Sequence, residues 1–199
     1  MIKLYGFSSS GNCHKVRLLL EQLNTPYEWH EIDILKGESQ TPSFLAMNPT
    51  GQVPTLELAP GKYLVESNAM LCYLAEGTKY WPNDAYARAE TLSWMFYEQY
   101  SHEPFIAVAR FICKFLPPDD VRQAELPRLH ERGEKALQVM EDHLSSRKYF
   151  VADQYTIADI ALYAYSHCAE EGGFVLNQYP AVQHWIARVE QQENFIPMK

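Results

Sequence analysis

The stretch from Asn48 to Ser67, NPTGQVPTLELAPGKYLVES, limits the fold of this chain more than any other. Two short apolar runs, 55–58 and 63–65, flank a loop with proline and glycine, a pattern that predicts a β-hairpin. Pro54 stands at the start of the first run, where a missing N–H is tolerated. If the Val53–Pro54 bond is cis, the N–H and C=O of Val53 point outward and can pair with an extended peptide.

The hairpin ends in Glu66-Ser67, and a helical pattern begins directly after it. Ser67 is therefore the predicted N-cap of this helix, whose first N–H groups suit a carboxylate. Together these features predict a pocket that holds a peptide backbone at Val53 and an anion at Ser67. The alternative is a proline corner followed by an ordinary helix cap, with no ligand.

The periodicity of the chain separates two regions. The first predicts strand, helix and strand, then a short helix, the hairpin and a further helix, an order that implies a mixed four-stranded sheet in the thioredoxin arrangement. The expected elements are a strand at 2–5, a helix from 13 to 23, a strand at 27–34, a helix at 42–47, strands at 55–58 and 63–65, and a helix at 68–76.

Residues 78–86 have the composition of a linker, and the pattern after them is helical throughout. We expect a long aromatic-rich helix over 87–115 with a kink near Pro104, and a helix over 121–144. In the latter, Pro127 marks either a kink or a late first turn. Residues 156–159 match a capping box in which Asp159 acts in folding, and Pro180 begins the last helix.

Composition narrows the possible partners. The net charge of −8 argues against nucleic acid and anionic membrane surfaces, and no window approaches the length of a membrane span. The four cysteines, Cys13, Cys72, Cys113 and Cys168, are scattered and mostly lie in helical patterns, which indicates buried, reduced thiols. The chain opens on a strand pattern and not on a leader, so we expect a cytoplasmic protein. The histidines show no metal-ligand spacing, and no metal is expected.

The motif NPxGxVPTL followed by Glu-Ser resembles the glutathione-binding half of the glutathione S-transferase family, and the resemblance covers essentially the whole chain. It implies a thioredoxin-like α/β domain over 1–77 and an all-helical C-terminal domain over 87–199. The bacterial, serine-type members, theta- or zeta-like, are the nearest in pattern. The family is dimeric, so the resemblance also implies a homodimer.

The junction between the first strand and the first helix is where thioredoxin-fold redox enzymes carry C-x-x-C. Here those four positions read Ser10-Gly11-Asn12-Cys13, which removes dithiol chemistry but leaves a hydroxyl at a helix start. Such a hydroxyl can hydrogen-bond a thiolate. Ser10 matches the catalytic serine of the family, with Ser9 and Asn12 as further candidates. Tyr5 is a weaker alternative, and serines that only cap the helix are another.

The resemblance assigns the remaining glutathione contacts by position. Glu66 and Ser67 would hold the γ-glutamyl end, the backbone of Val53 beside Pro54 the cysteinyl part, and Gln52 with Gln40 the glycyl end. The family often has a basic residue or a histidine near these last two positions, whereas this chain has glutamines. The contact to the glycyl carboxylate therefore departs from the family pattern. Cys13 is expected to be a buried packing residue, although at a helix start it could instead be a reactive thiol.

The second substrate would contact the long aromatic helix, through Tyr100, His102, Arg110 and Phe111. The predicted function is that of a glutathione S-transferase, which activates the glutathione thiolate for attack on a small hydrophobic electrophile. One alternative is a glutathione-dependent isomerase of the maleylacetoacetate type, whose loop carries Ser-Ser-Cys where this chain has Ser9-Ser10-Gly11. The other is a non-catalytic binding or regulatory protein of the same fold.

Overall fold

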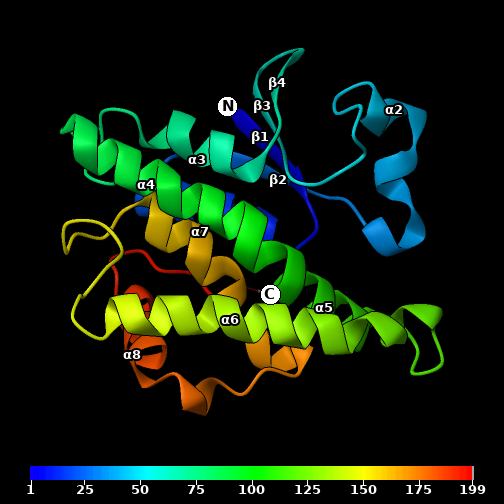
Figure 1. Cartoon of the computed structure of the whole chain (residues 1–199). Helices are drawn as coiled ribbons and strands as arrows, with labels where there is room; N and C mark the ends of the chain where they lie inside the picture. The colour runs from blue at the N-terminus through cyan, green and yellow to red at the C-terminus, as the bar shows by residue number, and fades with distance from the viewer. Residues whose placement is uncertain (199) are drawn as a thin grey trace. The chain divides into compact units, whose positions relative to one another are not determined.

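The computed structural model describes residues 1–198 and divides them into two compact units (Figure 1). The first unit holds Met1–Thr78 together with the chain from Gln192, and the second holds Lys79–Gln191. The structure therefore assigns residues 79–86 to the second unit, whereas the sequence predicted a linker at 78–86. Tyr80 is buried in the second unit, where its carbonyl accepts a 3.1 Å bond from Ile157 N. The C-terminal residues join the first unit, where Asn194 Nδ2 lies 3.2 Å from Asn24 Oδ1.

The first unit is built on the predicted mixed sheet, with strands in the order β2-β1-β3-β4. β1 pairs in parallel with β2 and antiparallel with β3, and β3 and β4 form the hairpin. The strands are β1 (Ile2–Gly6), β2 (Tyr27–Glu31), β3 (Thr55–Ala59) and β4 (Lys62–Leu64). β2 is shorter than the expected 27–34, because the chain turns into a 3₁₀ turn at Ile34–Lys36.

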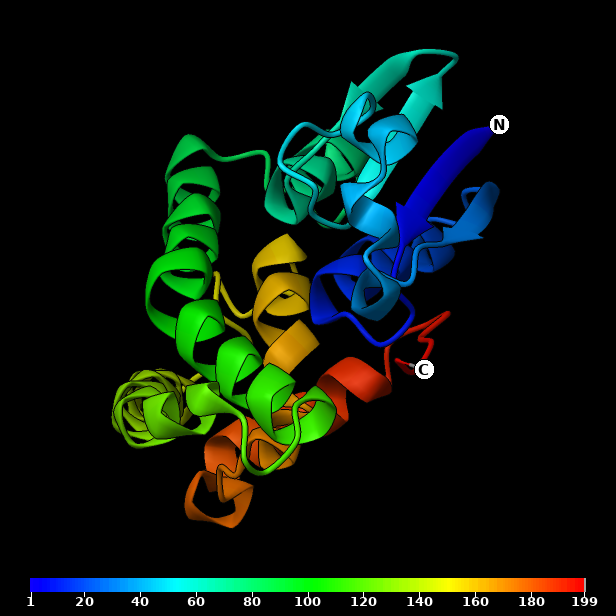
Figure 2. The same cartoon turned by 90° about the vertical axis from the view of Figure 1, so that its right-hand side faces the viewer.

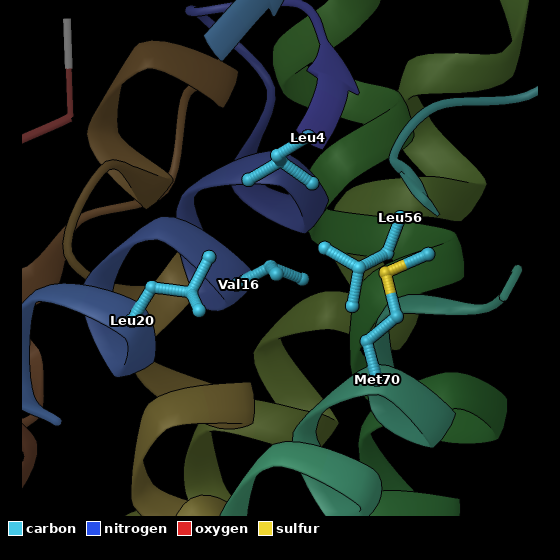
Figure 3. Close-up of a cluster of buried hydrophobic side chains, with 5 residues drawn as sticks. All are labelled: Leu4, Val16, Leu20, Leu56 and Met70. Atoms are coloured by element: carbon cyan, nitrogen blue, oxygen red, sulfur yellow. The ribbon is translucent and has the colours of Figure 1, made fainter. Parts of the chain in front are cut away.

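Three helices complete this unit: α1 (Gly11–Gln22), α2 (Pro42–Leu45) and α3 (Ser67–Ala75). A second 3₁₀ turn, Glu38–Gln40, precedes α2. The core lies where α1 and α3 pack on the sheet. Figure 3 shows its five fully buried side chains pointing toward one another: Leu4, Val16, Leu20, Leu56 and Met70. This packing fixes the starts of α1 and α3, where the candidate site lies.

The second unit contains no strand element and is helical, as predicted. Its helices are α4 (Ala85–Tyr97), α5 (Glu103–Phe115), α6 (Leu126–Leu144), α7 (Ile157–Ser166) and α8 (Pro180–Glu190), with 3₁₀ turns at Val121–Glu125, Ala169–Gly172 and Leu176–Gln178. Pro127 lies in the first turn of α6, so the late-first-turn alternative is confirmed. Pro180 opens α8, also as predicted.

A π-helical turn at Glu98–His102 joins α4 to α5, and the three segments form one bent rod, green in Figure 2. Pro104 follows at the start of α5, where its missing N–H breaks the regular helical ladder. The expected kink is therefore confirmed at this position, with a π turn as its local form.

The capping box at α7 is also confirmed. Asp159 is fully buried, and its Oδ2 accepts bonds from Thr156 N at 2.9 Å and Thr156 Oγ1 at 3.2 Å. Its Oδ1 accepts from Trp185 Nε1 at 2.9 Å and Phe150 N at 3.3 Å. Burial raises the pKa of Asp159 to about 6, while these hydrogen bonds act in the opposite direction.

Candidate functional site

Ser10 is the N-cap of α1, with extended backbone (φ −90°, ψ 125°). Its Oγ accepts a hydrogen bond from Cys13 N at 3.4 Å, and its own N–H donates to Phe7 O at 2.9 Å. Accepting through a lone pair leaves the hydroxyl proton available to a ligand. The first N–H groups of α1 add a partial positive charge at the same place. The hydroxyl can therefore donate to an anion at the helix start.

Asn12 and Ser67 come from opposite ends of the unit's sequence, and the structure joins them. Ser67 Oγ donates to Asn12 Oδ1 at 3.2 Å, which links the start of α1 to the start of α3. The predicted anion position and the predicted thiol-activating turn therefore lie beside one another. Ser9 precedes the cap and is partly buried.

Ser67 is the first residue of α3 and not its N-cap, so that expectation is wrong. The cap position is Glu66, whose backbone has φ 69° and ψ 112° and whose side chain makes no capping bond. Because the chain turns sharply at Glu66, the Ser67 side chain points to Asn12 and Lys15 instead of back along its own helix. Ser67 is buried and Glu66 is exposed.

Lys15 was not recognised from the sequence as part of this region. The periodicity of α1 places it between apolar positions, yet it is fully buried. Its Nζ lies 3.4 Å from Ser67 Oγ and 3.4 Å from Asn68 Oδ1, at the start of α3. A positive charge therefore stands behind the position predicted for an anion. No local signal could have revealed it, because the contact spans 52 residues.

The Val53–Pro54 peptide bond is cis, as expected. The loop around it is held by the buried side chain of Asn48, a second residue that sequence reasoning missed. Asn48 Nδ2 donates to Gln52 O at 2.8 Å and to Thr55 Oγ1 at 3.3 Å, and Asn48 Oδ1 accepts from Thr50 N at 3.1 Å. One amide thus links the backbone before Val53, at Thr50 and Gln52, to the side chain of Thr55 after it. The asparagine before Pro49 was the available signal.

The two candidate glutamines lie on the same loop system. Gln40 Nε2 donates to Gly51 O at 3.0 Å, next to Gln52 in the chain. Gly51 has φ +64°, a left-handed backbone conformation that favours glycine over residues with a Cβ. Both glutamine side chains are exposed, but Gln40 Nε2 also donates to Ser39 Oγ at 3.3 Å, so both of its protons are already used within the loop.

Tyr5 and Cys13 are the two alternative reactive groups in this unit. The Tyr5 hydroxyl donates to Glu57 Oε2 at 3.0 Å, and burial together with Glu57 raises its pKa to about 12. The Tyr5 hydroxyl is therefore bonded to Glu57 on β3 and not to the loop before α1. Cys13 is fully buried, and burial raises its pKa to about 12. The expectation of a packing cysteine is confirmed, and the reactive alternative is wrong.

The four second-substrate candidates all lie in the second unit, in different environments. Tyr100 in the π turn is 86% exposed, and Phe111 on α5 is partly buried. His102 is fully buried, with Nε2 2.8 Å from Ser166 Oγ. Arg110 is 3% exposed, and its Nε lies 2.8 Å from Glu171 Oε2. His102 and Arg110 are thus bound within this unit, whereas Tyr100 presents most of its side chain.

All four cysteines are free thiols. Cys13 and Cys168 are buried, but Cys113 is exposed and Cys72 intermediate, so the expectation of buried thiols fails for two of them. Within residues 1–198, no three His, Cys, Asp or Glu side chains are grouped so as to hold a metal ion. Over the same residues, no helix has the length and apolar character needed to cross a membrane.

A thioredoxin-like sheet with a serine at the α1 start and a cis-proline loop, followed by an all-helical unit, is the architecture expected of the transferase family that the sequence resembles. The family models agree. Residues 4–79 match the N-terminal domain of glutathione S-transferases, and residues 95–193 match the C-terminal domain.

Named glutathione S-transferases are among the known proteins similar to this chain. A glutathione S-transferase structure from Pseudomonas fluorescens Pf-5 is 52% identical with a TM-score of 0.95, covering 99% of this chain and 98% of that one. The curated glutathione S-transferase GstB of Escherichia coli K12 is 30% identical over 96% of this chain and 94% of its own length. A transferase family member from Pseudomonas fluorescens Pf-5 with two glutathiones bound is 27% identical, with a TM-score of 0.85, over 97% of this chain and 89% of that one.

The chain belongs to the glutathione S-transferase family and is an enzyme of that class.

Proposed function

We propose that this protein binds glutathione at the first unit and that Ser10 stabilises its thiolate for attack on a small hydrophobic electrophile. The observation that carries the proposal is the geometry of Ser10: an N-cap hydroxyl whose oxygen already accepts from Cys13 N and whose proton can be donated. A relative that is crystallised with glutathione supports the choice of ligand.

The energetics are sufficient without a metal. A free thiol has a pKa of about 8.5, and lowering it by about two units requires about 2.7 kcal/mol. A hydrogen bond to a charged group contributes about 1.5–3 kcal/mol, and a helix N-terminus about 0.3–1 kcal/mol. The two terms at the start of α1 cover the requirement. Thiolate is then the main form at neutral pH, and binding holds it beside the electrophile.

We assign the remaining glutathione contacts by position, as the family resemblance implies. Glu66 and Ser67 hold the γ-glutamyl end of glutathione. The Lys15 ammonium, hydrogen-bonded to Ser67, favours the carboxylate of the γ-glutamyl residue at this position. The Val53 backbone beside Pro54 pairs with the cysteinyl part, and Gln40 and Gln52 receive the glycyl end.

For the electrophile we retain Tyr100 and Phe111, because His102 and Arg110 are engaged inside the second unit. Ser9 and Asn12 remain secondary candidates for the thiolate, Asn12 being held by Ser67. We further propose a homodimer in the cytoplasm, where four free thiols would stay reduced.

The test is the ionisation of bound glutathione. The protein is expected to be retained on immobilised glutathione, and adding glutathione should produce thiolate absorbance at neutral pH. Ser10→Ala should raise the pH of ionisation by about 1–2 units, the loss of one charge-assisted bond, while retention persists. Ser10→Thr, which keeps the hydroxyl, is the matched control. Unchanged ionisation in Ser10→Ala would move the role to Ser9 or Asn12.

Assays on the same purified protein distinguish the transferase from the two alternatives, a glutathione-dependent isomerase and a non-catalytic binding protein. Conversion of a maleyl-type double bond with glutathione returned unchanged would indicate the isomerase. A panel of activated halides, epoxides, peroxides and α,β-unsaturated carbonyls would reveal transferase substrates instead. Failure of retention together with absent thiolate absorbance would refute the proposal and favour the non-catalytic protein, an alternative that the named transferase relatives do not support.

A further inference from the structure

Glu31 is the last residue of β2, the edge strand labelled in Figure 1. Its carboxylate is bonded to the loop that carries Ser10. Glu31 Oε1 accepts hydrogen bonds from Ser8 N at 2.8 Å and from Ser8 Oγ at 3.0 Å. Its other oxygen, Oε2, accepts from Trp29 Nε1 at 2.8 Å. Both oxygens are therefore used, one by the loop and one by the strand from which Glu31 projects.

The loop between β1 and α1 needs hydrogen bonds from outside it because its residues offer little apolar surface for packing. Ser8, Ser9 and Ser10 are small and polar, so hydrogen bonds and not packing must fix their conformation. The loop is bonded at its ends: Ile32 N donates to Gly6 O at 2.7 Å, and Ser10 N donates to Phe7 O at 2.9 Å. Glu31 fixes the middle, at Ser8, from 23 residues away.

Trp29 gives the carboxylate a defined direction. Its ring lies against Gly6, where a Cβ would come within 2.7 Å of Trp29 Cη2. The Arg17 guanidinium of α1 lies 5.0 Å from the centre of the same ring. With the ring held in this way, Nε1–H points at Glu31 Oε2 and aligns Oε1 with Ser8. The contacts thus run from α1 through Trp29 and Glu31 into the loop.

We propose that Glu31 is a positioning residue for thiolate formation: by holding Ser8, it fixes the loop conformation in which the Ser10 hydroxyl faces the bound sulfur. The inference rests on the proposed function of Ser10. A carboxylate suits this role better than a neutral acceptor, because its hydrogen bonds are about twice as strong and the site is open to water. Small displacements of a reacting group are costly, up to about 10²-fold in rate for 1 Å.

A different role for Glu31 predicts the opposite sign. If its negative charge acts only through space, it disfavours thiolate, and removing the charge should lower the pH at which bound glutathione ionises. Positioning predicts that removal raises that pH, because the Ser10 hydrogen bond weakens. Arg17 on α1 is the charged group packed against the same tryptophan, and it is unchanged in every variant below.

The experiment titrates thiolate absorbance of bound glutathione and measures kcat and KM in wild type, Glu31→Gln, Glu31→Ala and Glu28→Gln. Glu28→Gln is the matched control, since it removes an exposed carboxylate from the same strand without a bond to the loop. Glu31→Ala should lower kcat about tenfold with KM for glutathione changed less than twofold, and should raise the ionisation pH by about one unit. Glu31→Gln, which keeps an acceptor oxygen for Ser8, should lie between wild type and Glu31→Ala.

Three results would overturn the inference. They are an ionisation pH that falls equally in both Glu31 variants, a loss confined to KM, or values equal to those of Glu28→Gln. If a Glu31 variant unfolds, Ser8→Ala replaces it: losing one of the two loop bonds should lower kcat by about half as much on a logarithmic scale. Absence of thiolate in wild type would instead refute the proposed function, so the two failures are distinguishable.

Discussion

Replacing Asp159 by asparagine separates two opposing effects on a buried carboxylate. Asp159 accepts four hydrogen bonds, which favour its charged form, yet burial raises its pKa to about 6. A carboxyl whose pKa is raised in the folded state adds stability below its unfolded pKa of about 3.9, and this stability is lost as the pH rises through the folded value. Asparagine has the same shape and no titration.

The magnitude follows from linkage. With pKa values of about 6 folded and about 3.9 unfolded, wild type gains about 1.3 kcal/mol between pH 7 and pH 5 from this group alone. At pH 7, Asp159→Asn should cost about 1–3 kcal/mol, because its amide N–H₂ cannot accept from Thr156 N and leaves that buried donor unpaired. The difference between wild type and variant should therefore widen by about 1.3 kcal/mol on going to pH 5.

The assay is urea unfolding of both proteins at pH 5, 6 and 7, followed by the loss of helical signal. Asp119→Asn, which makes the same substitution at an exposed position of the same unit, is the control. A wild-type advantage that stays flat or narrows at pH 5 would refute the reasoning. It would mean that the four donors outweigh burial and that Asp159 is charged throughout this range.

Three other changes test features described by the structure. Glu141→Ala should lower the free energy of unfolding by about 1.5–3 kcal/mol, because Glu141 accepts two 3.0 Å bonds from N–H groups in the first turn of α8; exposed Asp142→Ala is the control in the same urea assay. Gly6→Ala should cost about 1–3 kcal/mol by overpacking against Trp29, measured as a lower urea midpoint, and a neutral result would contradict the close contact. Cys113 should react with a thiol-alkylating reagent before the other three cysteines, as peptide mapping would reveal; earlier modification of a buried thiol would contradict the burial pattern.

The features that could be predicted from the sequence are those set by neighbouring residues. The hairpin, the cis peptide at Pro54, the capping box at α7 and the helix start at Pro180 each depend on residues within a few positions of one another. Turn and cap chemistry is local, so its signals are visible in a single sequence. The alternation of strands and helices likewise predicted the mixed sheet, and the family motif located the cis-proline loop.

The features that were missed depend on distant partners. Lys15 has the periodicity of a surface residue of α1. It is buried, and its Nζ hydrogen-bonds to Ser67 and Asn68 at the start of α3. Ser67 was expected to cap α3, but its hydroxyl is drawn to Asn12, 55 residues away. His102 and Arg110 looked available on an aromatic helix and are bound by Ser166 and Glu171. Periodicity reports which face of a helix is apolar, not which polar groups meet across the fold.

The separation of Tyr5 from the α1 loop has a consequence for kinetics. Its hydroxyl belongs to Glu57 and titrates only near pH 12, while the serine at the helix cap does not ionise in water at all. The acidic limb of a plot of log kcat against pH would then belong to the sulfur of the co-substrate and not to Tyr5 or Ser10. Replacing glutathione by an analogue with a more acidic thiol should shift that limb by the difference between the two thiols, with the protein itself unaltered.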